Sequence, residues 1–208
     1  MERGPAFRSF DESWAHLLAR DEPLENFVGG LPEDPRAAVA VWLVPVSAEG
    51  RRGLVRVREG LERLEWLRPL PDHFLHVTVA GLGFVEPETD VRDLVEGGRE
   101  RLRGLAPFRL RFPRLNCFHE AVVAEAEGNG LQEAAQRLHG DVDLFLPHLS
   151  LAYTTAPGPP GELRKALLPI RDTPLGVDDV REIQLCLVPA SRTTILGPWT
   201  VAGRVFLR

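Results

Sequence analysis

Hydrophobic and polar positions recur along the chain with two periods, and the period indicates which kind of element to expect. Apolar runs that are rich in β-branched residues and bounded by turn residues predict strands at 37–46, 74–85, 108–115, 117–126, 144–154, 180–188 and 201–207. Apolar residues spaced three or four apart predict amphipathic helices, in whole or in part, at 10–19, 54–67, 91–105, 131–138 and 162–168.

The order strand, helix, strand, helix, strand occurs twice, over about 37–115 and again over 116–208. A duplicated β-α-β-α-β unit predicts an α+β fold of two similar lobes, with mainly antiparallel sheets around a central cleft. Pseudo-two-fold symmetry would bring equivalent strands together. We expect residues 1–36, with a short helix that has Asp11 or Ser13 near its cap, to form an N-terminal extension packed on the 37–208 domain.

The middle strand of each predicted unit contains the same short motif, HVTV at residues 76–79 and HLSL at 148–151. Side chains alternate between the two faces of a strand, so the histidine and the hydroxyl of each motif share one face. The apolar residues face the core. If the two strands are neighbours, two imidazoles and two hydroxyls line one small cleft, which is the expected active site.

These residue types suit proton transfer around a phosphate. Histidine titrates near pH ~6.5, so His76 and His148 on opposite sides of a phosphate can act as an acid and base pair. Thr78 and Ser150 can donate hydrogen bonds to the non-bridging oxygens. No metal or cofactor is needed, because the leaving oxygen is protonated rather than coordinated. A zinc site that adds His73 is the alternative, but His73 lies three residues before His76 and faces the other side of a strand.

A single motif of this kind is more often structural than catalytic. The second copy, at the matching place in a duplicated pattern, is the observation that favours function.

Composition restricts the partners and the location of the protein. The formal net charge is −5, which argues against a strong, sequence-independent grip on a nucleic acid backbone. The two cysteines provide neither a disulfide framework nor metal-type spacing. No apolar run approaches the ~20 residues of a membrane helix, and the N-terminus lacks an apolar signal core. We therefore expect a cytoplasmic monomer with no membrane partner and no bound metal.

At the doubled motif the chain resembles the two-histidine (2H) phosphoesterases, in particular RNA 2′,3′-cyclic phosphodiesterases, also called 2′-5′ RNA ligases. The similarity extends over about residues 37–208. It includes the apolar strand 37–46, the sequence RPLP at 68–71, Gly83 after the first motif and Pro147 before the second.

The resemblance implies a two-lobed α+β fold and metal-independent hydrolysis of a cyclic phosphate or related phosphodiester. The substrate would be an RNA terminus or a small nucleotide. It also implies that His148 activates water while His76 protonates the leaving oxygen.

Two positions depart from the pattern of the bacterial RNA ligases. The aromatic residue found five positions after the first histidine is here Gly81, and the arginine found five positions after the second is Tyr153. Phe84 and Tyr153 are instead the candidates to stack on a base, with core or rim packing as the alternative for both. The departures concern the substrate more than the chemistry. Two other functions stay open, a nucleotide- or RNA-end-binding module without catalysis and 2′-5′ RNA ligation.

Overall fold

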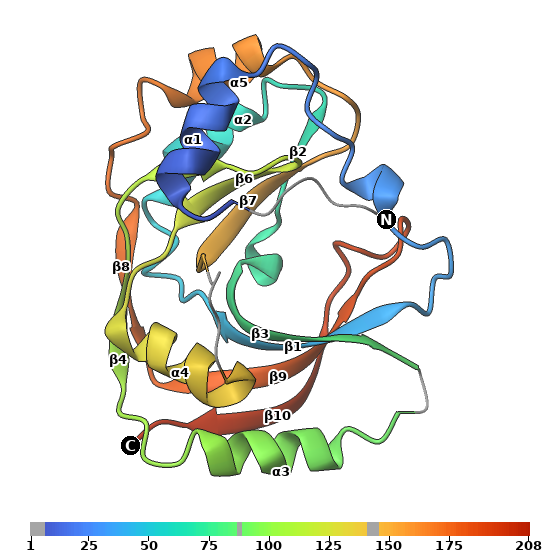
Figure 1. Cartoon of the computed structure of the whole chain (residues 1–208), viewed down its shortest axis with the longest axis vertical. Helices are drawn as coiled ribbons and strands as arrows, with labels where there is room; N and C mark the ends of the chain where they lie inside the picture. Colours follow the sequence, from blue (N-terminus) through green and yellow to red (C-terminus); the bar gives the residue numbers. More distant parts are fainter. Residues whose placement is uncertain (1–6, 87–88, 141–145) are drawn as a thin grey trace.

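The computed structural model describes residues 7–86, 89–140 and 146–208, and an eight-stranded sheet runs through them (Figure 1). Seven strands form its continuous order, namely β10 (Thr200–Phe206), β9 (Glu182–Pro189), β1 (Ala38–Pro45), β3 (His76–Val85), β7 (His148–Thr154), β6 (Ala121–Glu125) and β5 (Leu115–Cys117). The eighth, β2 (Leu67–Pro69), pairs with β7. A separate sheet pairs β4 (Phe108–Phe112) with β8 (Gly176–Val180). The pairings between these strands are antiparallel, which confirms the predicted α+β class.

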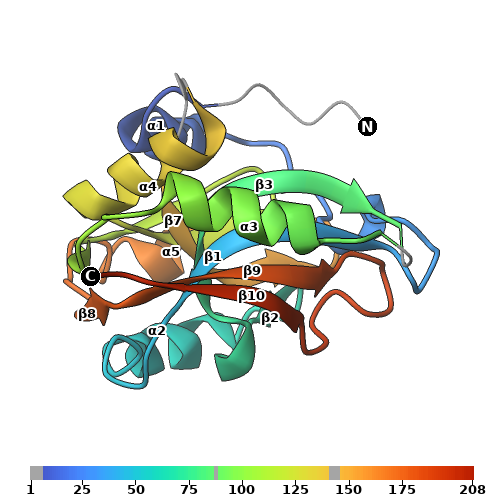
Figure 2. The same ribbon diagram turned by 90° about the horizontal axis from the view of Figure 1, so that it is seen from below.

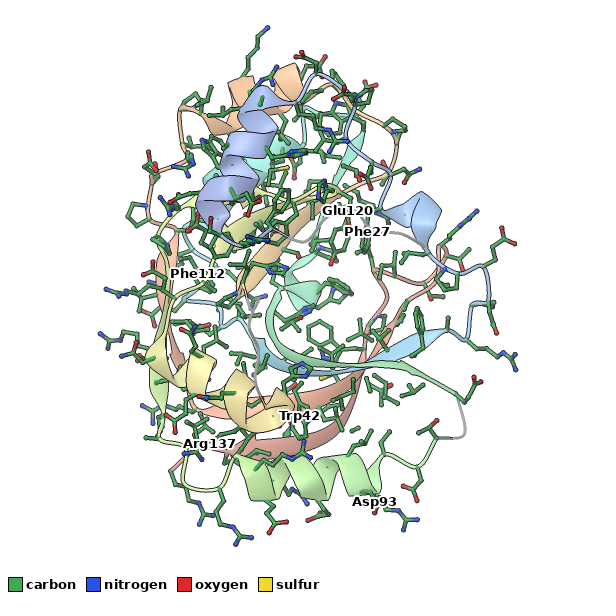
Figure 3. The ribbon with its side chains drawn as sticks, in the orientation of Figure 1. Phe27, Trp42, Asp93, Phe112, Glu120 and Arg137 are labelled. Carbon is green, nitrogen blue, oxygen red and sulfur yellow. The ribbon has the colours of Figure 1, made fainter. Side chains whose placement is uncertain are left out.

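Helices cover this sheet from several sides. They are α1 (Phe10–Ala19), α2 (Leu54–Leu61), α3 (Arg92–Arg101), α4 (Asn129–His139) and α5 (Pro160–Leu167), with short 3-10 turns η1 (Val28–Gly30) and η2 (Asp72–Phe74). Figure 2 shows α1 and α2 on opposite sides of the molecule. One of the central glycines of α3 has a packing role, because a Cβ on Gly98 would lie 2.0 Å from the indole of Trp42 on β1 (Figure 3).

Several predicted elements are shorter than expected. The helix predicted over 54–67 ends at Leu61, because the chain turns there and Leu67 begins a strand that pairs with β7. The strand predicted over 108–115 ends at Phe112, before Pro113, and Leu115 starts β5. In both cases the apolar pattern of the sequence continues past the point where the chain changes direction, so the predicted element was too long.

Two more predicted strands extend across the boundary between two observed strands. The strand predicted over 180–188 contains the end of β8 and most of β9, and the strand predicted over 117–126 is divided between the end of β5 and β6. The part of the predicted strand 144–154 that precedes residue 146 lies outside the described residues.

Residues 7–36, which we call the N-terminal segment, contribute side chains to the core. Trp14, Leu17 and Leu24 are buried, and Leu24 forms a β-bridge with Gly158. The predicted cap of α1 is wrong, because Ser9 accepts the hydrogen bond from the Glu12 N–H. The division into an extension and a domain of two pseudo-repeats stays a prediction.

Candidate active site

The two motif strands are neighbours near the middle of the sheet, where β3 and β7 meet at one residue pair, Val77 and Leu149. On their other sides, β3 pairs with β1 and β7 pairs with β6. The two strands diverge away from this pair (Figure 1). Contact across 72 residues of sequence is therefore concentrated at the motifs.

The register places four polar side chains on one face. Direct partners in an antiparallel pair share a face, and their flanking residues point to the other face. Val77 and Leu149 are buried, and so are Val79 and Leu151. The side chains flanking the pair are half-buried and share the opposite face; they are His76, Thr78, His148 and Ser150. A charge on the His148 imidazole lowers the pKa of His76, so the two rings interact electrostatically.

Both imidazoles are held in the same way. His76 Nδ1 lies 2.7 Å from the carbonyl oxygen of Phe74, and His148 Nδ1 lies 2.8 Å from that of Leu146. A carbonyl oxygen has no proton to give, so each neutral imidazole carries its proton on Nδ1 and donates it to the residue two positions earlier. In both rings Nε2 is then the basic nitrogen, available to accept a proton.

Burial sets the protonation state of the pair. Desolvation lowers the pKa of His76 to about 4, the positive charge of His148 adds to this, and the hydrogen bond to Phe74 opposes it. Desolvation likewise lowers the pKa of His148, against the hydrogen bond to Leu146. Both imidazoles are therefore neutral at pH 7 in the free protein. An anionic phosphate between them would favour the protonated form of one.

Aromatic rings stand edge-on against both imidazoles. Phe74 and Trp199 contact His76, with ring centroids 5.5 and 5.2 Å away. Phe118 contacts His148 at 4.8 Å and an interplanar angle of 86°. The sequence motifs did not point to these three residues. Phe74 could have been found from its place two residues before His76, whereas the other two lie in loops whose position no local pattern predicts.

A β-bulge follows the hydroxyl residue in each motif strand. From Thr78 to Gly81, three residue steps on β3 are matched by two on β1, and the same holds from Ser150 to Tyr153 on β7 against β6. The extra residue reverses the alternation of faces. Gly81 and Tyr153, both five positions after a motif histidine, therefore lie on the histidine face.

The residues proposed to stack on a base occupy different places. Tyr153 is half-buried, and Phe27 of the N-terminal segment stacks on it with centroids 4.0 Å apart at 24°. Phe84 is 65% exposed and lies on the same face as His76. It is eight residues further along the strand, which is roughly 20 Å at ~3.3 Å per residue once the bulges are allowed for. A Cβ at Gly81 would meet no heavy atom within 4 Å, so the histidine face is open at this position.

Phe27 is fixed in this place by its backbone. Its N–H donates to the Thr154 hydroxyl at 3.0 Å, and that hydroxyl donates to the Glu120 carbonyl at 3.1 Å. Figure 3 shows Phe27 and Glu120 side by side in accordance with these bonds. One face of Tyr153 is thus covered by the N-terminal segment.

Other candidate chemistry does not assemble. Among residues 7–86, 89–140 and 146–208, no three His, Cys, Asp or Glu side chains are grouped so that they could hold a metal ion, and the set of His73, His76 and His148 is no exception. The His73 Nε2 lies instead 3.2 Å from the Leu196 carbonyl oxygen. Cys117 and Cys186 are buried free thiols, and burial raises the pKa of both to about 12. Within the same described ranges, no helix is long and apolar enough to cross a membrane.

Comparison with known proteins shows the family of the chain. Residues 47–185 match the family described as the 2′-5′ RNA ligase superfamily. The chain is 30% identical over 138 residues to the RNA 2′,3′-cyclic phosphodiesterase of Thermus thermophilus, covering 57% of this chain and 69% of that protein.

Two solved structures share the fold. The crystal structure of TT0787 from Thermus thermophilus aligns with a TM-score of 0.60 at 24% identity, over 82% of this chain and 98% of that one. Escherichia coli LigT complexed with 3′-AMP aligns with a TM-score of 0.59 at 20% identity, again over 82% of this chain and 98% of that one. The family expected from the doubled motif is thus confirmed, and the chain belongs to the 2′-5′ RNA ligase superfamily of 2H phosphoesterases.

Proposed function

We propose that this protein hydrolyses a 2′,3′-cyclic phosphate or related phosphodiester, at an RNA end or on a small nucleotide, with His76 and His148 as the acid and base. The matched anchoring of the two imidazoles carries the proposal. Both histidines share one face beside the Val77–Leu149 pair, and both Nδ1 atoms donate to a carbonyl two residues earlier. Two equivalent Nε2 atoms on one face are what a proton relay through a phosphate requires.

In the proposed reaction, a water oxygen attacks the phosphorus as His148 Nε2 takes the water proton. The bond from phosphorus to the 2′ or 3′ oxygen breaks, and protonated His76 delivers its Nε2 proton to that oxygen. The products are a phosphate monoester and a free hydroxyl, and the two histidines exchange their protonation states. The assignment of base and acid follows the resemblance to the 2H family.

Thr78 and Ser150 complete the proposed site. Their hydroxyls flank the imidazoles on the same face and can donate hydrogen bonds to the non-bridging oxygens. Such bonds would hold the phosphate in line and stabilise the charge that develops in the transition state. Tyr153 contributes to the wall of the site, and Phe84 would reach only a more distant nucleotide of a longer substrate.

The deciding experiment is turnover of cyclic mononucleotides and cyclic-phosphate-ended RNA by histidine variants. We expect His76→Ala and His148→Ala each to lower kcat by roughly 10²–10⁴-fold, the usual contribution of a positioned acid or base. The double variant should be scarcely slower than either single one, because the pair acts as a unit. His73→Ala is the matched control and should keep its activity, because its imidazole is held at Leu196.

Full activity in His148→Ala would contradict the proposal, and so would loss of activity on treatment with EDTA. Tight binding of a 2′-phosphate by the unaltered protein, without turnover of any cyclic substrate, would instead identify a binding module. Joining of RNA ends as the dominant reaction would identify a ligase.

A further inference from the structure

The ring of Phe118 is a contact of the His148 imidazole that comes from outside the motif strands. Phe118 lies in the tight turn between β5 and β6, where its N–H donates to the Ala121 carbonyl at 2.8 Å. Its edge-on contact with His148, at 4.8 Å and 86°, limits rotation of the imidazole about its Nδ1 anchor. The Leu146 hydrogen bond alone fixes one ring atom, and Phe118 supplies the second constraint.

The N-terminal segment covers Phe118 in turn. Phe10, the first residue of α1, lies parallel to Phe118 with centroids 6.1 Å apart and an interplanar angle of 6°. Phe7 stacks on the same ring at 6.1 Å and 23°. Two rings from the N-terminal segment therefore back the ring that contacts His148.

A buried polar network fixes the position of α1 relative to Phe118. The fully buried Ser13 hydroxyl contacts the Cys117 carbonyl and lies 3.1 Å from Asn116 Oδ1. Asn116 Nδ2 donates to the Phe10 carbonyl and to Glu125 Oε1, both at 2.9 Å. Because buried polar groups are costly to leave unpaired, this network specifies one register of α1 against β5.

The same network reaches the second motif strand. Glu125 is buried, pairs with Arg114 at 2.8 Å and stands opposite His148 in the β6–β7 register. The start of α1, the Phe118 turn and the strand that carries His148 thus form one packed unit. The family match begins only at residue 47, so the N-terminal segment lies outside it.

We propose that the start of the N-terminal segment supports the active site, with Phe10 acting through Phe118 as a positioning residue for His148. The catalytic consequence rests on the proposed function, whereas the contact rests on the geometry alone. A ring that is free to rock would take Nε2 out of line with the phosphorus. A shift of this kind lowers kcat more than it raises KM.

The test uses the full-length variants Phe10→Leu and Phe118→Leu. Phe118→Tyr, which keeps the ring, serves as the conservative rescue. Trp14→Leu is the matched control, because Trp14 is a buried aromatic of the same helix that packs on the Arg171 guanidinium, 4.4 Å from the ring centroid. The readouts are kcat, KM, thermal unfolding and the NMR titration of the His148 ring protons, assigned from their absence in His148→Gln.

We expect Phe10→Leu and Phe118→Leu to lower kcat roughly tenfold with KM changed less than about twofold. Their His148 pKa should rise toward its ordinary value, because water reaches the ring, while that of His76 should not move. Two titratable residues, His76 and Glu125, lie on the strands next to His148. Both are unchanged in the two leucine variants. Phe118→Tyr should behave as the unaltered protein, and Trp14→Leu should lower the melting temperature without changing kcat or the His148 titration.

The proposal is overturned if both leucine variants keep the original kcat and His148 titration. It is also overturned if Trp14→Leu reproduces their changes, since that would mean a general loosening of the fold. If Phe118→Leu does not fold, Phe10→Leu decides, because Phe10 is only half-buried and its carbonyl still accepts from Asn116. Full activity in His148→Ala would defeat the proposed function, yet the titration would still test the contact.

Discussion

The hydroxyls of Thr78 and Ser150 share a face with the two imidazoles, and their roles can be separated from packing because both side chains are half-buried. A valine matches the shape of threonine and lacks only the hydroxyl, so the comparison isolates the hydrogen bonds that this group makes. At the scale of single residues, the hydroxyls are therefore expected to donate hydrogen bonds, whereas the imidazoles are expected to transfer protons.

We predict that Thr78→Val and Ser150→Ala each lower kcat on a cyclic nucleotide by roughly 10²-fold, the lower end of what one lost donor to a transition-state oxygen costs. Thr78→Ser keeps the hydroxyl and should stay within about threefold of the unaltered protein. Steady-state kinetics of the three variants measures this. Equal rates for Thr78→Val and Thr78→Ser would show that the hydroxyl contributes nothing to turnover.

At the scale of elements, the two motif strands share an arrangement of histidine, hydroxyl and bulge. The bulges place Gly81 and Tyr153 on the histidine face, in an otherwise alternating strand pattern. The histidine face is open at Gly81, on the His148 side of the Val77–Leu149 pair. Tyr153, with Phe27 stacked on it, lies on the other side, next to Phe74 and His76. At the two bulges the difference is in the side chain, since one ends at a glycine and the other at a tyrosine.

The glycines that follow the first motif differ in their backbone requirement, and this gives a stability prediction. Gly83 has φ +93°, a conformation that L side chains rarely adopt, whereas Gly81 does not have a positive φ. We expect Gly83→Ala to lower the free energy of unfolding by about 1–2 kcal/mol, and Gly81→Ala to change it by less than about 0.5 kcal/mol.

Urea unfolding of the two alanine variants measures this difference. Neither added methyl group meets a heavy atom within 4 Å, so Gly81→Ala controls for added volume. Equal destabilisation of both variants would show that backbone strain is not the cause.

At the scale of the whole molecule, histidine burial couples stability to pH. Burial lowers the folded-state pKa of His16, His76 and His148, for His76 to about 4. Between pH 6.5 and 4 the unfolded chain therefore binds more protons than the folded one at these sites. The free energy of unfolding should fall as pH falls through this window.

We predict that His76→Gln flattens this pH dependence. A pKa of about 4 against 6.5 in the unfolded chain corresponds to about 3 kcal/mol lost by the unaltered protein across the window, and the variant should not lose this part. Denaturant unfolding at about pH 7, 5.5 and 4 spans the window and gives the comparison. Parallel curves for the two proteins would contradict the assigned burial of His76.

The sequence by itself determined the family, the α+β class and the shared face of each histidine and hydroxyl, because these depend on residue identity and on a period of two along one strand. The tertiary structure decided how each Nδ1 is anchored and where helices end. It also decided that Trp199 contacts the His76 imidazole, that Phe118 contacts the His148 imidazole and that Phe10 lies against Phe118. Those contacts join segments far apart in sequence, and their pairing depends on the packing of the whole core, which local periodicity does not encode.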